Sequence, residues 1–295
     1  MSTKLLVPLL NDSVTTFKGP TWFLSEDISI ESIAPEDFGI IFSAAPDQYK
    51  AILLAKTKCI RIENVDPISG SDIARCESSK IAFLLNYFKT MHPIVLLFAV
   101  QITKKHKARI DKIIDLPAIS DTHMQRKKKY HIRSDTRRDY ISQFYKVLNV
   151  VHSKHPGILL TLDRFNSALL RTEPCDKIID ITISLESLIS GTSELRNRFS
   201  LYNSWTAEPD TTKRKKTFEL LMSLYDARSS IVHGTDMSTK TYGKTIQPLL
   251  DRWNDIISIT ERVLGYYIFF VYSKGLESWD QHLENLALGL DKRIV

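Results

Sequence analysis

From residue 158 to the end of the chain, apolar residues recur at intervals of three and four, and this period constrains the fold more than any other feature. Leu162 and Phe165 share one face of a first predicted helix, and Ile178, Ile181 and Leu185 share one face of the next. Such stripes are typical of amphipathic helices that bury one side. The pattern predicts an antiparallel bundle of four or five helices. Its expected segments are 159–171, 174–189, 194–205, 213–231 and 244–273, with a short terminal helix over 276–290.

The first part of the chain has a different period. Two segments, 22–33 and 51–63, carry apolar residues at alternate positions over their later halves, as half-buried strands require. A short helix is expected to begin at Pro35, because proline is tolerated in the first helical turn. A longer helix is predicted over 71–91. The continuous apolar run over 93–100 predicts a buried strand.

A break between these two patterns marks a domain boundary. His155, Pro156 and Gly157 provide turn chemistry at the point where the helical period begins. At 295 residues the chain is long enough for two domains of ordinary size. The predicted fold class is therefore α+β, with a mixed α/β domain over 1–155 and an all-helical domain over 156–295.

A basic segment runs from 104 to 138. It contains twelve lysines and arginines against four aspartates, whereas the whole chain has a net charge of +6. Its densest run is Arg126, Lys127, Lys128 and Lys129. A concentrated positive patch attracts RNA by releasing counterions, so these four residues are candidate RNA contacts. The alternative is a solvated loop, and the segment is expected to form either an extended hairpin or a loop.

The cysteines and the apolar runs exclude several classes of protein. Cys59, Cys76 and Cys175 are widely spaced and form no Cys-x-x-Cys pair or Cys/His cluster. Neither a disulfide framework nor a metal site is expected, and a reducing cytoplasm fits this cysteine usage. The longest apolar runs, 93–100 and 263–272, are too short to cross a bilayer. We expect no cofactor and no membrane insertion.

One short stretch carries groups that suit RNA chemistry. Arg228 and His233 stand five residues apart on an apolar-flanked segment that closes on Gly234, the residue best suited to a left-handed helix cap. RNA cleavage without a metal requires a base, an acid and cations that hold the developing charge. Histidine titrates near neutrality, and arginine is a permanent bidentate cation. Arg126 and His131 repeat the spacing inside the basic run, and we interpret that pair as coincidence.

Helix geometry limits how the two groups act together. Five residues turn about 500°, which leaves Arg228 and His233 about 140° apart on a straight helix. They share one stripe only if the helix ends or unwinds between them, and Gly234 offers such an ending.

The stretch Leu224-Tyr225, followed by Arg228-Ser-Ser-Ile-Val-His233-Gly234, resembles the Arg-x4-6-His motif of HEPN domains, in particular the Apea-like HEPN group. The resemblance extends upstream to about residue 158, through 181–188 and 194–201. Many members of this superfamily are metal-independent RNases of bacterial immunity or toxin systems. Others have lost activity and act as binding modules.

The resemblance implies a cytoplasmic endoribonuclease of defence or toxin biology, with Arg228 and His233 as catalytic residues and RNA as substrate. In HEPN nucleases the matching pairs of two protomers meet across an interface, so a homodimer through the C-terminal domain is expected. A protein or phage-derived trigger is a possible further partner. The alternative is an inactive HEPN module that binds nucleotide, RNA or a protein partner. Ser229 bears on this choice, because many active members carry Asn, Asp or His directly after the arginine.

Three more residues are candidates for support or substrate binding, beside Ser229, whose hydroxyl can donate to phosphate. Glu186 is expected to orient Arg228 or His233, or else to be a carboxylate on a helix surface. Arg198 either binds substrate or faces solvent. Asp226 is the third candidate for support, and the structural alternative for Arg228 is an ion pair with Asp226 or with a neighbouring carboxylate. A structural alternative for His233 is a favourable interaction with the helix C-terminus.

Overall fold

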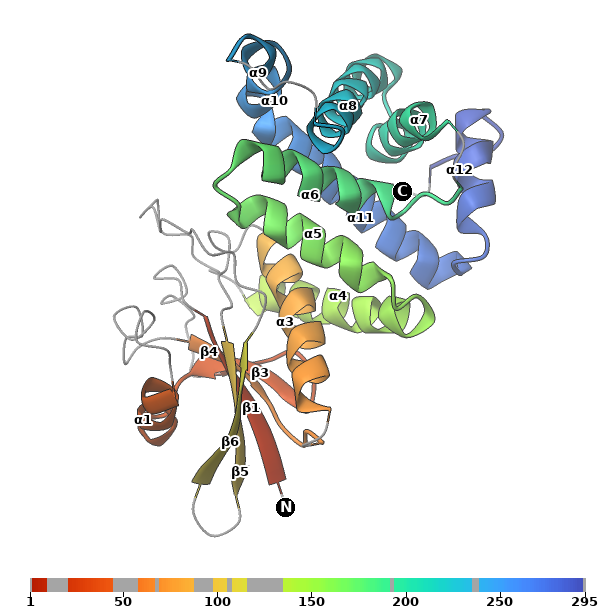
Figure 1. Ribbon diagram of the computed structural model, residues 1–295. Helices are drawn as coiled ribbons and strands as arrows, with labels where there is room; N and C mark the ends of the chain where they lie inside the picture. The colour runs from red at the N-terminus through yellow and green to blue at the C-terminus, as the bar shows by residue number, and fades with distance from the viewer. Residues whose placement is uncertain are drawn as a thin grey trace. The chain divides into compact units, whose positions relative to one another are not determined.

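The computed structural model describes residues 2–9, 21–44, 58–66, 69–87, 98–104, 108–115, 135–191, 194–234 and 239–293. The chain divides into two compact units, Met1–Lys146 and Val147–Val295, and the division falls within helix α4 (Asp135–Lys154). The first unit combines strands and helices, and the second is helical, so the protein has a mixed α+β fold (Figure 1). The sequence placed the boundary after residue 155, just beyond the end of this helix.

The first unit is built on a six-stranded antiparallel sheet with the strand order β2-β3-β4-β1-β5-β6. The N-terminal strand β1 lies inside the sheet, between β4 and β5, so the sheet forms only after distant parts of the chain have paired. The strands are β1 (Ser2–Leu9), β2 (Thr21–Phe23), β3 (Ile28–Ser32), β4 (Lys58–Ile62), β5 (Phe98–Lys104) and β6 (Ala108–Asp115). Among the described residues, the other helices of this unit are α1 (Pro35–Ala44) and α3 (Gly70–Tyr87).

One face of the sheet is apolar. Ile62 pairs with Leu5 and with Ile28, and residues paired across antiparallel strands point to the same face. All three side chains are buried. Gln101 pairs with Leu5 and so points to the same face. The Oε1 atom of Gln101 lies so close to Gly70, the first residue of α3, that a Cβ added to this glycine would be only 2.2 Å from it. Helix α3 therefore begins on this apolar face.

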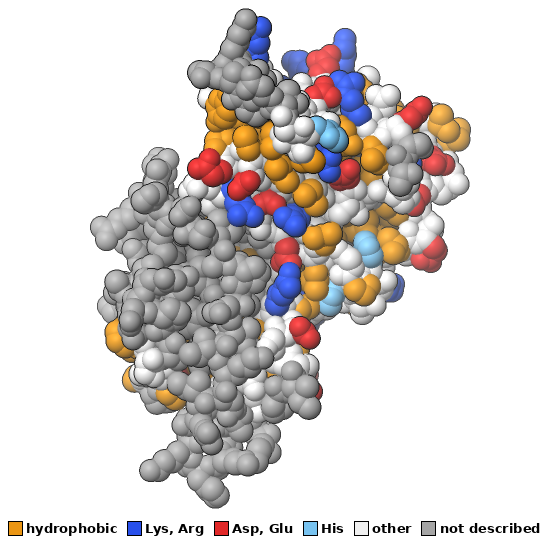
Figure 2. Space-filling model, in the orientation of Figure 1, with side chains coloured by type: hydrophobic (Ala, Val, Ile, Leu, Met, Phe, Trp, Pro, Cys, Tyr) orange, Lys and Arg blue, Asp and Glu red, His pale blue; other side chains and the backbone are white. Residues whose placement is uncertain are grey.

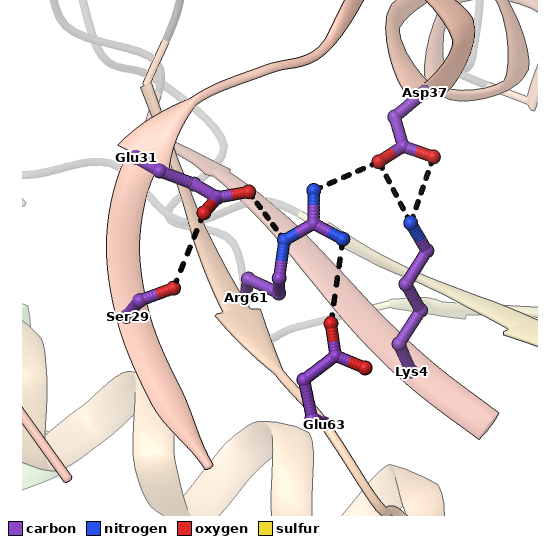
Figure 3. A network of polar contacts seen from close by, with 6 residues as sticks. All are labelled: Lys4, Ser29, Glu31, Asp37, Arg61 and Glu63. Atoms are coloured by element: carbon purple, nitrogen blue, oxygen red, sulfur yellow. Dashed lines mark hydrogen bonds and ion pairs between the residues drawn. The ribbon is translucent and has the colours of Figure 1, made fainter. Parts of the chain in front are cut away.

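The opposite face carries a connected network of charges (Figure 3). Asp37 of α1 accepts hydrogen bonds from Lys4 Nζ at 2.7 and 2.9 Å and from Arg61 Nη2 at 2.9 Å. Arg61 also donates to Glu31 through Nε and lies 3.4 Å from Glu63. Burial acts to raise the pKa of Asp37, but the hydrogen bonds and charges of Lys4 and Arg61 lower it. Each charge of the network thus has an opposite charge beside it, as burial requires.

The second unit packs helices against one another around a buried central helix, α11. Contacts join α5 to α6, α7 to α8 and α6 to α8, while α11 packs against both α6 and α7. Eleven residues of α11 are buried, which is typical of a helix surrounded by others. The helices are α5 (Ile158–Leu170), α6 (Pro174–Glu186), α7 (Leu195–Ala207), α8 (Thr211–Val232), α9 (Thr239–Thr245), α10 (Gln247–Asp251), α11 (Trp253–Lys274) and α12 (Trp279–Ala287).

The first unit differs from expectation mainly at its strands. The segment 22–33 forms two paired strands, β2 and β3, because the chain turns back where Leu24 N–H donates to the carbonyl of Ile28 at 2.9 Å. The helix that begins at Pro35 is confirmed. The apolar run over 93–100 is described only from Phe98 onward, where β5 continues to Lys104.

The expected single helix over 244–273 is wrong. The chain there forms α9, α10 and α11, and Pro248 lies in the first turn of α10, where a proline does not have to donate to a preceding turn. Arg252, between α10 and α11, leaves helical geometry with φ −106° and ψ 19°. Hydrophobic period alone did not reveal these breaks, because Ile246 and Leu249 stay buried across them.

The charge network generates a stability prediction. Asp37→Asn should lower the free energy of unfolding of the first unit by about 3 kcal/mol, because the buried Lys4 loses its carboxylate partner and Arg61 loses one of its three. The pKa of Asp37 is lowered in the folded state, so its carboxylate stabilises the fold above about pH 4 and this contribution disappears as the pH falls. Hydrogen exchange of the β1 and β4 amides across this pH range measures both effects.

Glu26→Gln is the matched control, because Glu26 is an exposed carboxylate of the same unit. It should change the free energy of unfolding by no more than about 0.5 kcal/mol and leave the acid dependence in place. Equal protection of the β1 and β4 amides in the two variants would contradict a structural role for Asp37.

Candidate functional site

The candidate site lies at the C-terminal end of α8. The helix begins at Asp210, whose carboxylate accepts the Lys213 N–H at 2.8 Å, a side-chain N-cap. It remains regular through Val232, where His233 is the C-cap residue and donates its N–H to the carbonyl of Ser229 at 3.0 Å. Gly234 then adopts φ +65°, the left-handed conformation expected of a glycine cap. The helix therefore ends after His233 and does not unwind between the two motif residues.

Arg228 is half-buried and faces α6. Its Nη2 atom lies 3.4 Å from Glu186 Oε2, longer than the 2.7–2.9 Å that is usual for a charge-assisted hydrogen bond. Its Nε atom is buried, and no acceptor for it is found in the part of the chain that the structure describes. The guanidinium is thus held loosely on one side and retains an unsatisfied donor, a state that a bound anion would relieve.

Tyr225 lies one helical turn before Arg228 and packs beside it. The Arg228 guanidinium carbon is 6.0 Å from the centre of the Tyr225 ring. The centre of the Phe199 ring, in α7, is 5.3 Å from the centre of the Tyr225 ring. Burial raises the pKa of Tyr225, and the charge of Glu186 raises it further, with Arg228 opposing. Tyr225 therefore stays a neutral phenol next to the Arg228–Glu186 pair.

His233 is exposed, and no described residue forms a side-chain hydrogen bond with it. Because α8 is regular, Arg228 and His233 keep the angular separation of about 140° expected for five residues. The structure brings Glu186 to Arg228 and leaves His233 apart from both. Val232, next to His233, is 51% exposed, so the helix end presents an apolar side chain beside the histidine.

The other proposed supporting residues have separate partners. Asp226 accepts hydrogen bonds from Arg196 of α7, so the carboxylate beside Arg228 is the neighbouring Glu186 and not Asp226. The Arg198 guanidinium carbon lies 5.5 Å from the Tyr202 ring centre. The Nη1 atom of Arg198 lies against Gly191, where an added Cβ would be only 2.3 Å away. Arg196 and Asp226 are thirty residues apart, so no local pattern indicated their pairing.

Ser229 follows Arg228 on α8 and is half-buried, with its carbonyl accepting the N–H of His233. The four basic candidates Arg126, Lys127, Lys128 and Lys129 lie outside the described residues, as does His131. Of the basic segment, Lys104 at the end of β5 and residues 108–115 of β6 are described, and these two strands pair with each other.

The surface of the helical unit is mixed in character. Figure 2 shows apolar side chains interspersed with basic and acidic ones on the face turned to the viewer. Within the described ranges, no helix is both long and apolar enough to span a bilayer. In the same ranges, no group of three His, Cys, Asp or Glu side chains is arranged to hold a metal ion. The three cysteines are free thiols, and burial raises the pKa of Cys59 to about 12.

Comparisons of the chain with protein-family models, with curated proteins and with solved structures found no match.

The helix cap at Gly234 can be tested with a matched pair of glycines. A Cβ at either Gly234 or Gly243 would meet no atom within 4 Å, but only Gly234 has a positive φ. Gly234→Ala should therefore destabilise the helical unit by about 1 kcal/mol through backbone strain. Gly243→Ala, within α9, should be neutral or stabilising by up to about 1 kcal/mol. Urea unfolding followed by circular dichroism distinguishes these outcomes, and equal effects would exclude a left-handed cap.

Proposed function

We propose that the protein is a metal-independent endoribonuclease of the HEPN type, in which Arg228 and His233 act on RNA. The observation that carries the proposal is the state of Arg228: a half-buried guanidinium with one long contact to Glu186 and a buried Nε without an acceptor among the described residues. By contrast, the buried carboxylate of Asp180 in the same unit accepts hydrogen bonds from both Arg164 and Arg171. A phosphate would supply the acceptors that Arg228 lacks, with the bidentate geometry that arginine favours.

The two motif residues have distinct chemical roles. The exposed His233 imidazole takes the proton of the 2′-hydroxyl. An imidazolium, either His233 itself once it holds that proton or a protonated His233 of a second protomer, then protonates the leaving 5′-oxygen. Arg228 holds the charge that develops on the phosphorane oxygens. Glu186 limits the rotation of Arg228, and Tyr225 supports its guanidinium from α8. None of these groups requires a metal ion or a cofactor.

Both groups act on one phosphate more easily in a dimer. Within one protomer Arg228 faces α6 while His233 is exposed at the end of α8. A two-fold axis near this helix end would bring Arg228 of one chain toward His233 of the other. Exposed Val232 beside His233 offers apolar surface for such a contact. The basic segment 104–138 would recruit RNA, or sense a protein or phage-derived trigger in defence or toxin biology.

A competing function also has an observation in its favour. Arg228 has a carboxylate partner in Glu186, which is what a purely structural arginine would have, and Ser229 departs from the residues common in active members of the HEPN group. On this alternative the helical unit is an inactive module that binds nucleotide, RNA or a protein partner. Cleavage of RNA distinguishes the two functions.

The purified protein should cleave single-stranded RNA in the presence of EDTA. Arg228→Ala and His233→Ala should each lower the single-turnover rate by about 10²-fold or more, because each removes a different contribution to the transition state. Single-turnover conditions separate the chemical step from binding. Because the two variants are purified in the same way as the unaltered protein, any cleavage that both retain measures contaminating RNase.

Arg126→Ala and His131→Ala form the matched control, because this pair has the same spacing within the basic segment. They should leave the chemical step unchanged, whatever their effect on affinity. Cleavage at the normal rate by Arg228→Ala or His233→Ala would refute the site, and no cleavage by the unaltered protein would favour the binding module.

A dimeric site predicts complementation between inactive variants. If each site takes Arg228 from one chain and His233 from the other, a mixture of Arg228→Ala and His233→Ala should regain about a quarter of the original activity. This follows because half of the dimers are mixed and one of their two sites is intact. Activity of the mixture, with molecular mass measured across the same dilution range, provides the test. Full activity in a protein that remains monomeric would exclude the interface.

A further inference from the structure

A second site lies at the opposite end of α8 from Arg228. A cavity of about 590 Å³ opens beside the first turn of α8, within the size range of small-ligand pockets. Arg214 lines it and is fourteen residues from Arg228, or about 21 Å along the helix axis. Three cationic and three apolar residues line the cavity: Arg214, Lys292, Arg293, Trp205, Pro209 and Leu286.

Arg214 is held in place before any ligand binds. Its guanidinium carbon lies 3.5 Å from the centre of the Trp205 ring. Its Nε donates to the carbonyl of Glu208 at 3.0 Å, and its Nη2 donates to that of Pro209 at 2.7 Å. For Nη1, no described residue serves as acceptor. A fixed guanidinium with free donors binds an anion at a small cost in side-chain entropy.

The charge of the cavity is positive. Its one acidic residue, Asp291, already accepts from His282 Nδ1 at 2.9 Å and lies 3.4 Å from Asn285 Nδ2. Asp291 is therefore not a dedicated partner of Arg214 or Lys292. Burial lowers the pKa of Arg214, with Asp210 opposing, which shows that its charge is partly removed from water. A bound anion would compensate for this desolvation.

The apolar residues indicate what the anion is attached to. Trp205, Pro209 and Leu286 form a wall beside the cations, and a flat ring packs well against such a surface. We propose that this cavity binds a mononucleotide, with its phosphate on Arg214, Lys292 and Arg293 and its base against the apolar wall. A free nucleotide and the 5′-phosphorylated end of an RNA both carry this chemistry. The proposal does not depend on cleavage at Arg228.

Calorimetric titration of the unaltered protein with AMP, adenosine and inorganic phosphate tests the site. AMP should bind about tenfold or more tightly than either fragment, because only AMP uses both the cations and the apolar wall. Lys292→Gln and Arg214→Lys should each weaken AMP binding by about tenfold or more, which is the usual effect of losing one charged hydrogen bond. Lys215→Gln should not weaken it, since Lys215 is exposed and does not line the cavity.

Several results would overturn the proposal. One is the absence of AMP binding at millimolar concentration, and another is equal affinity for AMP and phosphate. A third is a loss of AMP affinity with Lys215→Gln as large as the loss with Lys292→Gln. Arg214→Lys also removes two bonds to backbone carbonyls, so its fold is checked by circular dichroism. Lys292→Gln removes only an exposed side chain and keeps the test decisive if Arg214→Lys unfolds.

Competition with RNA identifies the source of the nucleotide. The protein carrying both Arg228→Ala and His233→Ala is used here, so that RNA cleavage does not interfere. Displacement of AMP by 5′-phosphorylated RNA, but not by the same RNA with a 5′-hydroxyl, assigns the site to an RNA end. Displacement by neither RNA assigns it to free nucleotide. Equal displacement by both would show that the phosphate is not recognised and would overturn the proposal.

Discussion

The regular geometry of α8 through Val232 determines where both candidate sites stand. Because the helix does not unwind before Gly234, Arg228 stays against α6 while His233 is exposed beyond it. The same helix places Arg214 at its other end, where the capping carboxylate of Asp210 fixes the first turn. One rigid element therefore separates Arg228 of the proposed cleavage site from Arg214 of the proposed nucleotide site by about 21 Å along its axis.

The treatment of buried charges distinguishes structural from functional groups. Asp37 has two cationic partners within 2.9 Å, and Asp180 of α6 likewise accepts from Arg164 at 2.8 Å and from Arg171 at 2.9 Å. Such pairing offsets the cost of removing charge from water. Arg228 is different, since its contact with Glu186 is 3.4 Å long and its Nε has no described acceptor. Under the proposed function, a bound phosphate satisfies this donor.

Much of the helical unit was predictable from period alone. Ile178, Ile181 and Leu185 were expected inward and are all buried, because a helix with one apolar stripe has a single face to bury. The breaks around α10 were not predicted, since a proline in a first helical turn does not interrupt the apolar period. In the first unit, alternation indicated strands, but the pairing of β1 with both β4 and β5 depends on contacts distant in sequence.

The sequence by itself determined the α+β class, the stripe that buries α6, and the glycine at the end of α8, because each follows from local period or from backbone conformation. Only the tertiary structure decided the partners of the charged groups. Asp226 bonds to Arg196 and not to its near neighbour Arg228, which instead meets Glu186 forty-two residues away. Arg214 meets Lys292 and Arg293 in one cavity for the same reason. Helix packing brings these side chains together, and no spacing along the chain encodes which helix faces meet.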